Sequence, residues 1–198
     1  MVNLKKISLI ILLILTAFLF SSCDSNERLT HLVIVQAIGI DCNENGVSVS
    51  IQYLDINKGT GTNEGVKGNI TAVVNGKGRS IASAITEAEK TLSGKLFFGQ
   101  NKLFVFGKGS DEKLGNALKS FLLDTTKSRP DVLVAESDSE AESVIKNKQR
   151  GSRVPAESLC LQLETEGCEV RVNDYLNSLD KTKIPVIKAT EDYTVVLK

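Results

Sequence analysis

Apolar and polar positions at the start of the folded part predict paired β-strands. Residues 32–41 are an apolar run rich in β-branched side chains, which is short for a helix and predicts a buried strand. Asn45-Gly46 follows, a pair typical of a tight hairpin turn. Residues 47–54 alternate between apolar and polar, which predicts a half-buried strand paired back on the first. A third short strand is expected over 67–74, ending at the glycines of Gly76-Lys77-Gly78.

Helical spacing appears next, between further short apolar runs. Residues 80–92 have apolar side chains three and four positions apart, which predicts an amphipathic helix. Ser80 stands in the capping position, and Ser83 stands where a capping box usually has Glu. The other expected elements are strands over 96–98 and 102–106, a helix over 110–123, a strand over 132–135 and a helix over 137–145.

This order of elements predicts two folded regions. Residues 31–147 are expected to form an α+β domain, with a mixed or antiparallel sheet and helices packed on one face. A basic stretch over 148–154 is expected to be a linker. Further helices and strands are expected after it, over 156–163, 172–179, 184–187 and 193–197. We therefore expect 155–198 to be the start of a second α+β domain, incomplete in this chain.

The N-terminus has the pattern of a signal peptide over residues 1–22. A basic start is followed by about 14 apolar residues, fewer than the roughly 20 that span a bilayer. Ser21 and Ser22 followed by Cys23 resemble a bacterial lipobox, although Phe20 and Ser22 replace the usual Leu and Gly or Ala. We expect cleavage before Cys23, lipid on its sulfur, and a short polar tether over 23–30. The alternative is a plain secretory signal with Cys23 unmodified.

Composition limits the possible chemistry. Without Lys5 and Lys6, the chain keeps 22 basic and 24 acidic residues, so nothing predicts a nucleic-acid partner. His31 is the only histidine, which rules out a multi-histidine metal site, and we expect no metal and no cofactor. If Cys23 carries lipid, three cysteines remain. Of these, Cys160 and Cys168 could be small buried residues or one disulfide.

No catalytic set stands out, so we expect a binding protein and not an enzyme. His31 adjoins an apolar strand, where a structural role is expected. The sequence has no G-x-S-x-G motif. Two carboxylate pairs are expected to lie on solvated helix faces: Glu87 with Glu89, and Glu140 with Glu142.

Four segments carry a resemblance to a known family. They are Asn26-Glu27-Arg28-Leu29 with the strand ending Ala37-Ile38-Gly39-Ile40-Asp41; Gly78-Arg79-Ser80-Ile81; Lys95 to Gly107, which includes Phe97-Phe98-Gly99-Gln100-Asn101; and Ser128-Arg129-Pro130-Asp131. With these segments, the chain resembles the N-terminal part of the spore germination lipoproteins, the C subunits of GerA-type germinant receptors. It departs from them at Gln100, where the family often has His, and in having no tryptophan.

The resemblance implies a receptor subunit anchored by lipid at Cys23. It would lie on the outer face of the spore inner membrane, beside two membrane-embedded subunits of the same receptor, and it brings no catalytic residues. Family members are about twice as long, so a truncated chain is expected. The alternatives are a lipid-anchored solute-binding or surface-interaction module, or a truncated paralogue without function.

Two features could take part in recognition. The glycine-rich loop over 59–68 could be a contact loop or a tolerated insertion. Phe97 and Phe98 could form an exposed aromatic contact, although at least one is expected in the core because aromatic residues are few.

Overall fold

The computed structural model describes residues 32–55, 69–147, 152–178, 184–190 and 194–196. They lie in one compact unit, Leu32–Lys198. The predicted signal peptide and tether, His31 and the loop over 59–68 lie outside the described residues.

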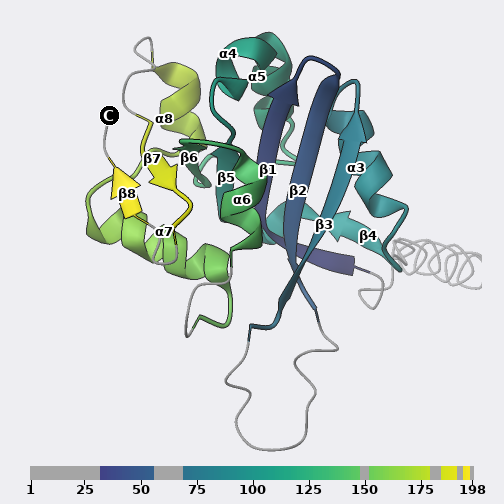
Figure 1. Cartoon of the computed structure of the whole chain (residues 1–198), viewed down its shortest axis with the longest axis horizontal. Coiled ribbons are helices and arrows are strands. Elements are labelled where there is room, and N and C mark those ends of the chain that lie inside the picture. Colours follow the sequence, from purple (N-terminus) through teal and green to yellow (C-terminus); the bar gives the residue numbers. More distant parts are fainter. Residues whose placement is uncertain (1–31, 56–68, 148–151, 179–183, 191–193, 197–198) are drawn as a thin grey trace, which may run out of the picture. The chain divides into compact units, whose positions relative to one another are not determined.

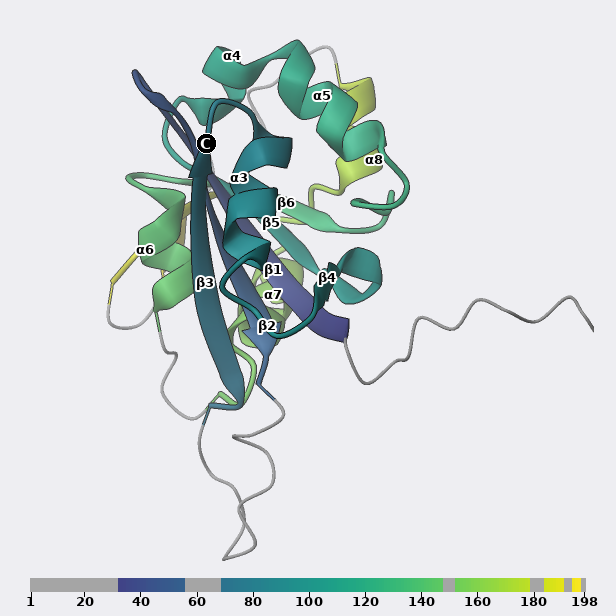
Figure 2. The same cartoon turned by 90° about the vertical axis from the view of Figure 1, so that its right-hand side faces the viewer.

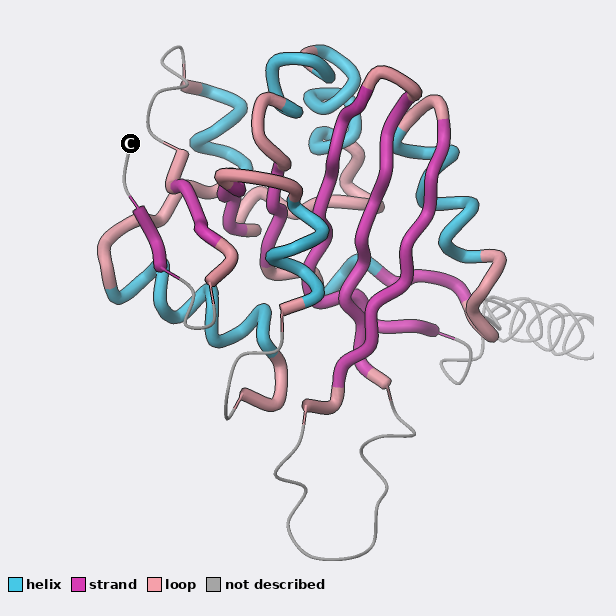
Figure 3. The backbone as a smooth tube through the Cα atoms, viewed as in Figure 1, coloured by secondary structure: helices cyan, strands magenta, loops and turns pink. Residues whose placement is uncertain are grey.

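A mixed β-sheet forms the centre of this unit (Figures 1 and 3). Its order is β3-β2-β1-β5-β6-β7-β8, and β4 pairs with the start of β1. The strands are β1 (Leu32–Asn43), β2 (Gly46–Leu54), β3 (Thr71–Gly78), β4 (Lys95–Phe97), β5 (Leu103–Phe106), β6 (Leu133–Ser137), β7 (Val186–Lys188) and β8 (Thr194–Val196).

The sheet combines an antiparallel and a parallel half. β1 and β2 form the predicted hairpin, in which Asn43 pairs with Gly46 at φ 134°, a backbone conformation that favours glycine. β3 continues the antiparallel half. On the other side of β1, strands β5, β6 and β7 follow in parallel. The class, α+β with a mixed sheet, is confirmed.

The helices, however, cover both faces of the sheet and not one (Figure 2). One face packs against α3 (Ile81–Glu89), α5 (Asn116–Leu123) and α8 (Val172–Asn177); the other packs against α6 (Ala141–Lys146) and α7 (Pro155–Thr165). The reason lies in β5, where Phe104 and Phe106 enter one core while Leu103 and Val105 enter the other. A strand that is apolar on both sides needs cover on both sides.

The region expected to start a second domain instead extends the same sheet. β7 pairs with β6, through Glu136 with Val186 and Ser137 with Ile187. α7 and α8 pack on opposite faces of that sheet. These contacts place the described part of 155–198 in the same compact unit as the rest, without a domain boundary at 148–154.

Several helix and strand boundaries differ from the predicted ones, each for a local structural reason. α3 begins after Ser80, whose side chain accepts from the Ser83 N–H, and the Ser83 hydroxyl completes the capping box that Glu usually closes. The helix expected over 110–123 divides into α4 (Ser110–Leu114) and α5, because Gly115 adopts φ 43° between them. β3 runs on through Gly76 and Gly78, where the sequence pattern indicated an end.

Candidate functional site

The described cysteines do not form a reactive centre. Cys42, Cys160 and Cys168 all have unpaired thiols, so the disulfide alternative is not formed. The Cys160 thiol donates to the carbonyl oxygen of Lys102 at 3.6 Å. Burial raises the pKa of Cys160 to about 12, so its thiol stays protonated and is not activated as a nucleophile.

The glutamate pairs on α3 and around the start of α6 lie on helix surfaces, as expected. Three of the four have partners: Lys90 at 2.6 Å for Glu87, the Leu96 N–H at 3.0 Å for Glu89, and Lys146 with Asn75 for Glu142. Glu140 is the residue that precedes α6. Within the described ranges, no group of three or more His, Cys, Asp or Glu side chains could hold a metal ion.

Asp41, which ends the first family segment, connects β1 to the start of α6. Its carboxylate accepts the N–H groups of Ala141 at 2.7 Å and Glu142 at 3.1 Å. These are two of the donors that a helix leaves without partners at its N-terminus. Burial raises the pKa of Asp41, and the two hydrogen bonds from backbone N–H groups oppose that rise. The strand and helix are therefore joined by one carboxylate across 100 residues of sequence.

Replacing Asp41 with alanine should lower the free energy of unfolding by about 2 kcal/mol, because two N–H groups of α6 lose their acceptor. Asp41→Asn, which keeps one acceptor oxygen, should lose less. Because the pKa of Asp41 is raised in the folded chain, its carboxyl group stays protonated to a higher pH there than in the unfolded chain. The carboxyl's contribution to stability should therefore fall as pH rises above the usual aspartate pKa of about 4.

Urea titrations of both variants and the parent from pH 4 to 7 would measure these effects. The free energy of unfolding of the parent should fall relative to that of Asp41→Asn as pH rises. If the free energies of unfolding of the parent and Asp41→Asn differ by the same amount at every pH, the raised pKa of Asp41 is contradicted.

A cavity of about 310 Å³ lies where β2 and β3 meet the end of α6. Gln52 lies in its wall and is 2% exposed. Its amide nitrogen donates to the Ile145 carbonyl at 3.2 Å, and its amide oxygen accepts the Ala156 N–H at 3.1 Å. The buried Gln52 amide therefore joins β2 to α6 and α7. These two hydrogen bonds explain why a polar side chain is buried here, and no ligand is needed to explain it.

The third and fourth family segments, Lys95 to Gly107 and Ser128 to Asp131, meet on one surface. It is made by residues 95–100 and 127–131, and we call it the motif surface. A guanidinium nitrogen of Arg129 donates to the Gly99 carbonyl at 3.1 Å. The Lys127 ammonium lies 5.5 Å from the centre of the Phe98 ring, within range of a cation–π contact. Side chains from two distant segments thus hold one surface together.

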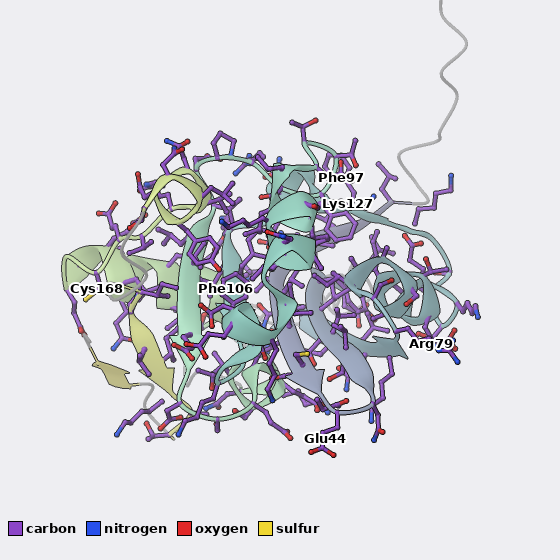
Figure 4. All side chains as sticks on the ribbon, turned by 90° about the horizontal axis from the view of Figure 1, so that it is seen from above. Glu44, Arg79, Phe97, Phe106, Lys127 and Cys168 are labelled. Carbon is purple, nitrogen blue, oxygen red and sulfur yellow. The ribbon has the colours of Figure 1, made fainter. Side chains whose placement is uncertain are left out.

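The two phenylalanines of this surface have different roles. Phe98 is 5% exposed and belongs to the core, as expected for at least one of the pair. Phe97 is 41% exposed, and its ring lies over Gly99, where a Cβ atom would meet the ring. Figure 4 labels Phe97 and Lys127 on one side of the molecule and Glu44 on the opposite side of that view. Lys127 was not singled out from the sequence, although it directly precedes Ser128-Arg129-Pro130-Asp131.

Comparison with known proteins identifies relatives of the chain. A family model described as the spore germination protein N-terminal domain matches residues 24–190, which confirms the resemblance carried by the four segments. Spore germination protein KC of Bacillus subtilis (strain 168) is 26% identical over 196 residues, which cover 92% of this chain and 48% of that protein. The chain therefore spans about half the length of this curated relative. No solved structure matches the chain significantly.

Proposed function

The chain belongs to the spore germination protein family and carries its N-terminal domain, and on this premise we propose that it serves as a lipid-anchored subunit of a spore germinant receptor. It acts in germination through contacts with other subunits and not through catalysis. The observation that carries the proposal is the extent of the family match, which begins at residue 24, directly after Cys23.

Lipid on Cys23 is the proposed means of attachment. The signal-peptide pattern of residues 1–22 and the small residues before Cys23 support cleavage and acylation at this cysteine. Among the residues that the structure describes, no helix is long and apolar enough to cross a membrane. Two or more acyl chains on one residue hold a protein stably on a bilayer, whereas a single chain does so only marginally.

The proposed location is the outer face of the spore inner membrane, next to two membrane-embedded subunits of the same receptor. The motif surface supports a role in binding, because it leaves a large apolar residue, Phe97, 41% exposed. Catalysis has no support from the described residues, where the buried Cys160 thiol is protonated.

Mass spectrometry of membranes from sporulating cells that express the chain would test this proposal. We expect a diacylglyceryl-modified peptide that begins at Cys23, and co-purification of the chain with membrane-embedded receptor subunits. A lipidated chain that purifies without those subunits would contradict the receptor role but support the anchor. An unmodified chain in the soluble fraction would contradict the anchor.

A further inference from the structure

The chain enters its folded unit at the edge that carries the motif surface. Leu32, the first described residue, pairs with Lys95, and Ile34 pairs with Phe97. In Figure 2 the start of β1 and β4 lie together at one end of the sheet, away from α4. Any tether attached before Leu32 therefore starts beside Lys95, two residues from Phe97 in the same strand.

The length of the tether restricts which face can approach the membrane. Nine residues lead from Cys23 to Leu32. A fully extended chain of this length reaches at most about 30 Å, and a flexible one has a typical end-to-end distance of about 17 Å. A compact unit of this size is about 40 Å across. A lipid on Cys23 thus keeps the start of β1 nearer to the bilayer than the opposite end.

The chemistry of the motif surface suits a lipid interface. Phe97 is apolar and 41% exposed, and the Lys127 ammonium lies over the ring of the next residue, Phe98. Arg129, with 43% of its side chain exposed, adds a second cation, which Asp131 partly balances at 3.2 Å. An aromatic ring bordered by cations can enter the headgroup layer while the charges meet lipid phosphates.

We propose that the motif surface lies against the membrane, with Phe97 in the headgroup layer and Lys127 and Arg129 facing anionic lipid phosphates. This inference rests on the proposed lipid anchor at Cys23. It orients the domain, so that the hairpin turn between β1 and β2 points away from the bilayer. The surfaces left for partner subunits would then be the sides and the far end of the unit.

The absence of tryptophan from the sequence allows a direct test. Phe97→Trp places a single fluorophore on the motif surface. Glu44→Trp places one at the hairpin turn, at the far end of β1, and Leu161→Trp places one on α7 at a leucine that is 64% exposed. The full lipidated chains would be bound to vesicles of phosphatidylglycerol and phosphatidylcholine with brominated acyl chains, which quench nearby tryptophan.

Emission of the Phe97→Trp chain should shift to shorter wavelength and lose intensity in brominated vesicles, whereas emission of the Glu44→Trp and Leu161→Trp chains should change little. Adding Lys127→Glu to Phe97→Trp should reduce the quenching, and adding Lys113→Glu, on α4, should not. Cooperative unfolding of each variant, followed by its own tryptophan, would show that the fold is intact.

The outcomes separate this inference from the proposed function. If the chain is lipidated and floats with vesicles, but Phe97→Trp is quenched no more than Glu44→Trp, the orientation is overturned and the anchor stays in place. If the Phe97→Trp fluorophore is unaffected by vesicles but shielded from iodide in receptor-containing membranes, the surface belongs to a protein partner, which also overturns the orientation. A chain without lipid on Cys23 overturns both proposals.

Discussion

Replacing Cys23 with alanine should move the protein from the membrane fraction to the soluble fraction without lowering the free energy of unfolding. The acyl chains are the proposed attachment, and polar or cationic contacts alone bind a bilayer weakly and are screened by salt. The compact unit begins at Leu32, so the change removes none of its described contacts. Membrane fractions washed at high salt, with denaturant titrations of the released chain, would measure both effects.

The variant is best made together with Phe20→Ala. The resulting Ala-Ser-Ser before position 23 resembles a plain secretory cleavage site, so the signal peptide can still be removed. Phe20→Ala alone, which keeps Cys23, is the matched control and should remain on the membrane. A cleaved double variant that resists the salt wash on membranes would contradict the lipid anchor.

Gly76→Val should be the most destabilising of the single substitutions considered, with a loss of about 3 kcal/mol. A Cβ at Gly76 would lie 2.6 Å from the Ala88 nitrogen and closer still to the Ala84 carbonyl oxygen. Both are backbone atoms of α3, so the whole helix must move away from the sheet. Native proteins are stable by only about 5–15 kcal/mol, so this is a large share of the total.

The neighbouring residue provides a control for this effect. Lys77 is exposed and follows Gly76 in the same strand, so Lys77→Val adds a similar side chain on the opposite face of β3. Its free energy of unfolding should stay within about 0.5 kcal/mol of the parent. Equal losses for the two variants in urea titrations would show that contact with α3 is not the cause.

Local pattern was sufficient for most secondary structure. The hairpin of β1 and β2 followed from alternation and Asn45-Gly46, and α3 followed from apolar spacing behind Ser80. These elements depend on residues close together in the sequence. Gly76 and Gly78 were misread for the opposite reason: glycine often ends a strand, but here it lets a helix approach the sheet, and the helix backbone that requires it belongs to another element.

Some features of the candidate site could likewise be predicted from the sequence, and others could not. The four family segments were recognisable in the sequence, and the residues around Cys23 predict that it carries lipid. The sequence did not indicate that Arg129 binds the Gly99 carbonyl or that Lys127 lies over Phe98. Both contacts join segments about 30 residues apart, and only the parallel pairing of β5 with β6 brings them together.

The sequence by itself determined the family, the α+β class and the hairpin, because each depends on patterns within a few turns or strands. Tertiary structure decided that helices cover both faces, that residues beyond 154 complete the same sheet, and that Phe97 is the exposed member of its pair. The physical reason is that apolar spacing shows that a side chain is buried but not what it is buried against. That choice is made when β5 and β6 pair and each face of the sheet acquires its own helices.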